Sequence, residues 1–123
     1  MNVAVAGHEG RLTARGVAEF KAEVLRWAAR IGVRPTRLQI QHMTTKWASC
    51  SSTGRVCFSR DLVSEAPAFQ EVVIVHELLH LLVPNHGKLF RSLMTAYVPA
   101  WESARGSRIK RVCGQSPQQS LEA

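Results

Sequence analysis

Four residues in the middle of the chain have the types and spacing to bind and use a metal ion. They include the motif His76-Glu77-x-x-His80, with two imidazoles four positions apart. On a helix these positions lie on one face, one turn apart, so both imidazoles reach one ion. His86 follows ten residues after His76 and offers a third nitrogen. We therefore predict a single zinc ion held by His76, His80 and His86.

Glu77 is the residue of this motif that can handle a proton. It lies one residue round the helix from His76, where its carboxylate can hydrogen-bond a zinc-bound water without joining the ligands. Zinc lowers the pKa of such a water to about 7, and the carboxylate can take its proton and pass it to a leaving amine. The motif thus predicts hydrolysis, with Glu77 as general base and then general acid.

The segment that carries the motif has the pattern of a buried helix. Residues 67–82 are apolar nearly all round, and the stretch is too short to cross a membrane. Three histidines and a glutamate would be costly in such surroundings without a metal, which disfavours the alternative of ordinary core histidines. Pro84 ends this helix, and apolar spacing over 87–97 predicts a following helix, capped by Asn85 or His86.

The preceding residues predict a helix and a small sheet. Apolar residues recur at helical spacing from Thr13 to about Ile31. Residues 37–43 alternate polar and apolar side chains, and 55–59 form a second strand-like run. Turn-rich residues at 52–54 predict a hairpin in an antiparallel sheet. The predicted fold class is α+β: a helix, a small antiparallel sheet, the active-site helix and following helices.

Length and composition limit the remaining functions. The 123 residues, 46% hydrophobic and 20% charged, fit one domain, which we place at 1–113 with a disordered tail at 114–123. No apolar run is long enough for a bilayer and the start lacks a secretory pattern, so we expect a cytoplasmic monomer that does not enter membranes. The odd number of cysteines favours reduced thiols at Cys50, Cys57 and Cys113, and a bridge between Cys50 and Cys57 across a hairpin is the alternative.

The formal net charge of +7 keeps nucleic acid open as a partner. Most basic residues are scattered along the chain, apart from a group at 105–111. No recognised DNA-reading motif is present. Binding of nucleic acid is therefore an alternative that the charge permits and no motif indicates.

Two blocks of sequence resemble the YgjP-like metallopeptidase family, which is placed near the zincins and the SprT-like proteases. Residues 46–54 are similar to the family's Arg-Trp-Gly-Ser-Cys-Ser block, with Ala48 in place of the glycine. Residues 73–90 are similar to its active-site helix followed by Asn-His-x-x-x-Phe. The resemblance covers about residues 38–101.

The resemblance implies a zincin-like core and a metallopeptidase with a protein or peptide substrate. It also implies that the strand preceding the active-site helix lies along the cleft, as edge strands do when they align an extended peptide. Trp47 and Ser49 would then lie near the substrate. For Trp47 the competing interpretation is a core anchor, the usual role of a tryptophan in a hairpin.

Three other functions stay open. Zinc-dependent hydrolysis of a nucleotide phosphoanhydride would need the same metal and water, although no Gly-rich phosphate loop is visible. A DNA-associated protease of the SprT-like kind would use the positive charge. A purely structural zinc site would need a fourth protein ligand, such as Cys50, because structural sites are normally closed.

Overall fold

The computed structural model describes residues 8–105 and 111–112, and its elements confirm the α+β class. The expected tail at 114–123 lies outside the described residues, as do parts of the expected domain 1–113. In chain order the elements are α1 (His8–Ile31), β2 (Arg37–Gln41), β3 (Lys46–Cys50), β4 (Arg55–Ser59), a 3₁₀ helix (Arg60–Ser64), α2 (Pro67–Leu79), α3 (Lys88–Tyr97), α4 (Trp101–Arg105) and β5 (Arg111–Val112).

The sheet has the strand order β2-β4-β3-β5 and is mixed. β3 and β4 form an antiparallel hairpin, with Ser49 opposite Cys57. The hairpin turn was predicted but β3 was not, since the predicted strands were 37–43 and 55–59. The prediction of a wholly antiparallel sheet is wrong, because β2 pairs with β4 in parallel and β3 pairs with β5 in parallel. Two successive reversals of the chain make β2 and β4 run in the same direction. The consecutive buried residues Val56, Cys57 and Phe58 suit the inner position of β4.

The turn between β3 and β4 lies where the sequence predicts it. The Gly54 N–H donates to the Ser51 carbonyl at 3.0 Å, and the Gly54 carbonyl accepts from the Thr36 N–H at 2.9 Å. Gly54 has φ +95°, a conformation that other residues adopt only with strain. A Cβ there would also lie 3.0 Å from Thr36 Cγ2. This glycine therefore allows the start of β2 to approach the hairpin.

Helix α1 starts earlier than its apolar pattern predicts and ends where expected. It begins at His8 rather than Thr13, although Gly10 is a poor helix former. At its end the N–H groups of Gly32 and Val33 donate to the Ala28 carbonyl at 2.8 and 2.9 Å. Gly32 has φ +91°, the left-handed conformation common just after a helix. Within the described residues, no helix combines the length and hydropathy that crossing a membrane requires.

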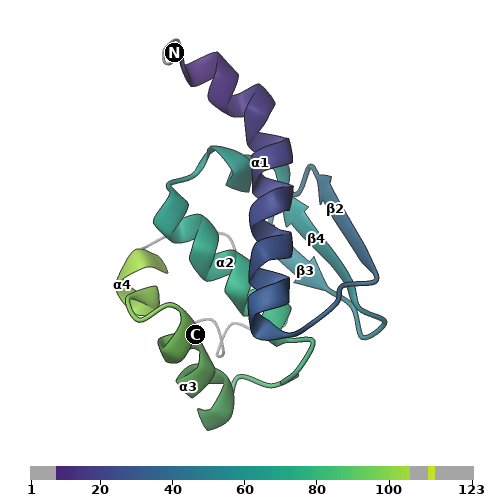
Figure 1. Ribbon diagram of the computed structural model, residues 1–123, viewed down its shortest axis with the longest axis vertical. Coiled ribbons are helices and arrows are strands. Elements are labelled where there is room, and N and C mark those ends of the chain that lie inside the picture. The colour runs from purple at the N-terminus through teal and green to yellow at the C-terminus, as the bar shows by residue number, and fades with distance from the viewer. Residues whose placement is uncertain (1–7, 106–110, 113–123) are drawn as a thin grey trace.

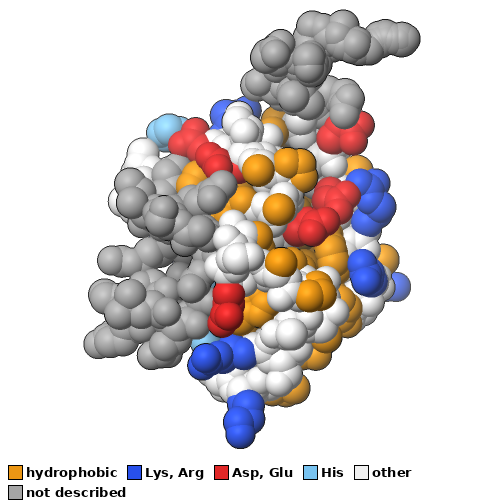
Figure 2. Space-filling model, turned by 90° about the vertical axis from the view of Figure 1, so that its left-hand side faces the viewer, with side chains coloured by type: hydrophobic (Ala, Val, Ile, Leu, Met, Phe, Trp, Pro, Cys, Tyr) orange, Lys and Arg blue, Asp and Glu red, His pale blue; other side chains and the backbone are white. Residues whose placement is uncertain are grey.

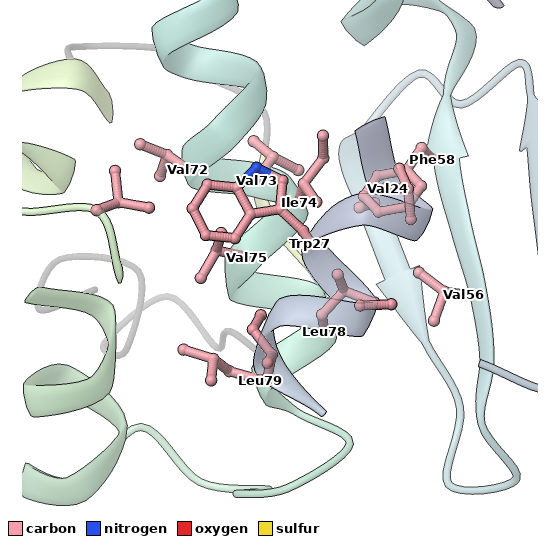
Figure 3. Close-up of a cluster of buried hydrophobic side chains, with 14 of the residues drawn as sticks. Val24, Trp27, Val56, Phe58, Val72, Val73, Ile74, Val75, Leu78 and Leu79 are labelled. Atoms are coloured by element: carbon pink, nitrogen blue, oxygen red, sulfur yellow. The ribbon is translucent and has the colours of Figure 1, made fainter. Parts of the chain in front are cut away.

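Helix α2 lies at the centre of the fold, between α1 with the sheet and the pair α3 and α4 (Figure 1). Side chains from α1, α2 and β4 meet in the core on one side of α2 (Figure 3). They include Val24, Trp27, Val56, Phe58, Ile74 and Leu78, all of them buried. Because neighbours surround α2, its residues are held rigidly.

Candidate metal centre

Helix α2 is buried along the half that carries the motif, as its apolar sequence predicts. Every residue from 72 to 79 is buried. His76 is 3% exposed and Glu77 is 0% exposed. Pro67 occupies the first turn, where a proline costs no hydrogen bond. The helix thus places two ionisable side chains in the apolar interior, where they need partners.

The end of α2 differs from the prediction. The α-helix ends at Leu79 instead of Leu82, with His80 as its C-cap. The N–H groups of His80, Leu81 and Leu82 donate to carbonyls three residues back, at 3.2, 3.0 and 2.9 Å. Such tighter turns are common at helix ends and satisfy donors before the chain leaves. His80 keeps a helical backbone conformation, so it still lies one turn after His76.

The loop after Pro84 brings His86 back to α2. The Asn85 side chain accepts a hydrogen bond from the Gly87 N–H at 3.0 Å. Gly87 is the N-cap of α3 and the cap lacks a side-chain hydrogen bond, so the expected capping by Asn85 or His86 is wrong. Asn85 stabilises the turn before the helix instead. His86 is 8% exposed and lies in the interior against the other two histidines.

The three imidazoles converge on one point. Their Nε2 atoms are 3.2 Å apart for His76 and His80, 3.1 Å for His76 and His86, and 3.0 Å for His80 and His86. Two nitrogens bound to one tetrahedral zinc at about 2.0–2.1 Å would lie roughly 3.3–3.4 Å apart. The observed triangle is within a few tenths of an ångström of that value. The residues therefore fit a metal ion.

Hydrogen bonding among the histidines cannot explain this triangle by itself. A proton on one Nε2 can be donated to only one of the other two nitrogens, which leaves lone pairs facing each other. A cation between the three rings would satisfy all of them. His80 is further oriented by its other nitrogen, because Nδ1 lies 3.3 Å from the Val83 carbonyl. A carbonyl only accepts, so Nδ1 donates and Nε2 carries the lone pair that can bind a metal.

The Val83 carbonyl orients the His80 ring, and the sequence did not predict this role. Its position follows from the break at Pro84, which ends the turn so that the Val83 carbonyl faces the His80 ring. The available signal was Pro84, four residues after His80, because a proline disfavours helical backbone at the residue before it. A backbone acceptor carries no residue-type signature, so the sequence did not reveal this one.

The number of protein ligands favours a site with an open position. Among the residues that the structure describes, the group able to hold a metal consists of His76, His80 and His86, and Cys50 does not join it. Catalytic zinc sites use three protein ligands and leave a fourth position for water or substrate, whereas structural sites are closed by four. His80 is only half-buried, so the cluster lies at the border between core and solvent.

Trp47 and Ser49 both lie on β3, which contacts α2, but their surroundings differ. Trp47 is 6% exposed and packs edge-on against Phe69 of α2, with ring centroids 5.2 Å apart. Ser49 is half-buried. The resemblance implied that the strand preceding α2 lies along the cleft like an edge strand, but that strand, β4, lies between β2 and β3. β3 is not an edge of the described sheet either, because β5 pairs with it on the side away from β4. Contact of either residue with a substrate stays a prediction.

Residues 7–107 match the family model for the YgjP-like metallopeptidase domain. No curated protein matches the chain. A similar solved structure is the crystal structure of the metallopeptidase zymogen of Methanocaldococcus jannaschii jannalysin, with 20% sequence identity and a TM-score of 0.58. The likeness covers 84% of this chain and 88% of that chain, and it concerns the fold.

The family match spans most of the chain, including α1, the strands β2 to β4, α2 and α3, and so it covers all three histidines and Glu77. The resemblance predicted from the two sequence blocks is confirmed, and so is the metallopeptidase fold. This chain belongs to the YgjP-like metallopeptidase domain family.

Proposed function

We propose that this metallopeptidase domain is zinc-dependent and cleaves peptide bonds by adding water, with Glu77 as general base. The observation that carries the proposal is the convergence of three Nε2 atoms to 3.0–3.2 Å beside a buried glutamate. Zinc is the ion that best suits a set of three neutral imidazoles, since calcium and magnesium prefer oxygen ligands. The described residues contain one such cluster, which fits a single ion.

Glu77 would move the proton in this reaction. A bound zinc ion would supply a lowered pKa for water and polarisation of the scissile carbonyl. Glu77 is held by the α2 backbone next to His76 and is fully buried, so its carboxylate acts where interactions with charge are strong. It would accept a proton from the attacking water and give it to the departing amine.

On the substrate side we propose that Ser49 contacts the peptide and that Trp47 acts by fixing β3 on α2. Ser49 is the more accessible of the two, whereas Trp47 is enclosed against Phe69. An extended peptide that added to β3 at the side away from β4 would have to displace β5. Other placements of the peptide leave β5 paired.

The test of the mechanism is Glu77→Gln, assayed for casein hydrolysis and for bound zinc. The amide keeps the size of the side chain but cannot accept the proton. We expect one zinc per chain, as in the wild type, and a rate lower by about 10²- to 10⁴-fold. Glu71→Gln, on the same helix but outside the histidine cluster, is the matched control and should retain wild-type activity. Wild-type hydrolysis by Glu77→Gln would falsify the proposed role.

The same assay separates the alternatives. A parallel assay with a nucleoside triphosphate tests whether the substrate is a phosphoanhydride. If the nucleotide is hydrolysed and casein is not, the peptidase proposal is wrong. For a DNA-associated protease, DNA binding should weaken steeply with salt. On the face in Figure 2, described Lys and Arg side chains are scattered among Asp and Glu without forming a patch. That face gives no support to DNA binding.

The proposal places the enzyme in a reducing compartment such as the cytoplasm. Cys57, buried on β4, is a free thiol. Disulfides are rare in such compartments. This supports the cytoplasmic expectation.

A further inference from the structure

The ring of Phe90 contacts all three histidines. Its centroid lies 5.0 Å from that of His76, 5.0 Å from that of His80 and 4.9 Å from that of His86. It is stacked on His80 at 24° and meets His76 and His86 edge-on, at 74° and 88°. Each pair is within the range of favourable aromatic contacts. One side chain that carries no ligand atom therefore touches every ligand of the site.

Phe90 is held in this place by the interior. Its side chain is 1% exposed, so the ring has no free space into which it could turn. The histidine rings surround it at equal distances, while their own centroids are 4.7–4.9 Å apart. The four rings thus form one compact cluster in which each ring contacts the other three.

The position of Phe90 in the chain explains why it can act on all three ligands. His76 and His80 come from α2, whereas His86 comes from the loop before α3. Phe90 lies in the first turn of α3, three residues after the N-cap Gly87. Its contacts with α2 therefore fix the start of α3, and with it the loop that delivers His86.

We infer that Phe90 is a positioning residue that preorganises the metal site. The ring holds the three imidazoles so that their Nε2 atoms already converge before the ion binds. Zinc affinity is then higher than in a site with mobile ligands, because binding has to order fewer side chains. The inference rests on the proposed zinc site but not on the reaction, since Phe90 supplies neither a ligand nor a proton.

Phe90→Leu tests this, with zinc affinity as the readout. Leucine keeps the position apolar but removes the flat ring. We expect zinc binding, measured by competition with a chromophoric chelator, to weaken by about 10- to 100-fold, the effect typical of groups around a metal's ligands. The visible spectrum of the Co²⁺-loaded variant should also change, because it reports the geometry of the ligands directly.

Phe58→Leu is the matched control. Phe58 is a core phenylalanine, 0% exposed, whose ring packs edge-on against Phe20 at 5.2 Å. We expect both variants to unfold at lower denaturant concentration, with only Phe90→Leu losing zinc affinity and changing the cobalt spectrum. Wild-type or tighter zinc affinity in Phe90→Leu overturns the inference, and so does an equal loss in both variants. If the wild type itself binds no zinc, the proposed function fails instead.

Discussion

The segment from His76 to Phe90, which begins within α2, and the strand β3, which contacts α2, differ in what holds their side chains. In the first, three ligands lie within eleven consecutive residues and are placed by one helix, one turn and one loop. In the second, Trp47 and Ser49 depend on pairing with β4 and with β5, more than sixty residues further along the chain. A site made of local structure can be predicted from spacing, whereas a surface made by distant pairing cannot.

The largest effect is expected from removing a metal ligand in the segment from His76 to Phe90. We expect His86→Ala to weaken zinc binding by more than the 10- to 100-fold that loss of a group outside the ligand set costs, since a ligand itself is removed. The measurement is chelator competition with purified protein. His42→Ala, at an exposed position, is the control and should bind zinc as the wild type does. Equal affinities in the two variants would mean that the metal lies elsewhere.

Trp47 should matter to stability more than to metal affinity. Its enclosed ring packs on Phe69, so Trp47→Ala should lower the free energy of unfolding by about 3–5 kcal/mol. Zinc affinity of the folded protein should change little, because Trp47 is outside the histidine cluster. Denaturant unfolding and zinc titration of one preparation test both points. A stable Trp47→Ala protein with raised KM would instead identify Trp47 as a substrate contact.

A smaller effect is expected at Ser49. Loss of one hydroxyl hydrogen bond to a peptide costs about 1 kcal/mol, or roughly fivefold in kcat/KM. Ser49→Ala should show this loss with unchanged zinc affinity and with stability within about 0.5 kcal/mol of the wild type. Ser64→Ala, at an exposed position of the 3₁₀ helix, should change none of the three. If Ser49→Ala also leaves kcat/KM unchanged, β3 does not contact the peptide at this residue.

The parts of the molecule that sequence predicts well are those determined by local patterns. The buried helix, the cluster of His76, His80 and His86, and the turn at Gly54 follow from helical period, ligand spacing and turn chemistry. The parallel pairing of β2 with β4 does not, because a strand's partner is set by packing and not by its own alternation. The pairing of β5 with β3 was missed because two residues carry no periodic signal.

The same distinction applies inside the site. Ligand types are visible in the sequence, but the groups that orient them are not. Val83 acts through its carbonyl, which every residue has, and Phe90 is visible as the last residue of the Asn-His-x-x-x-Phe block but without any indication of its role. Only the folded arrangement shows that the ring of Phe90 touches all three ligands rather than merely filling the core.

The smallest expected effect concerns a thiol in the sheet, away from the metal. Burial raises the pKa of Cys57, with partial opposition from the Arg55 charge. A raised pKa in the folded state means that the thiol's contribution to stability is full below the unfolded pKa, about 8.5. It is lost as pH rises through the higher folded value. The unfolding free energy should therefore fall above about pH 8.5, by at most about 1.4 kcal/mol per pH unit from this group.

Cys57→Ala isolates that contribution, because the alanine variant lacks the titrating group and all others are shared. The difference in unfolding free energy between the two proteins should be constant up to about pH 8.5 and then shrink. The rates at which Cys50 and Cys57 react with iodoacetamide compare the two neighbouring strands. Cys50 is half-buried on β3 and should react faster than the buried Cys57. A difference that stays constant to pH 10, or equal labelling rates, would mean that the β3–β4 pair opens readily. The sheet would then be the loose part of the fold, and the tightly held part would be confined to the segment around α2.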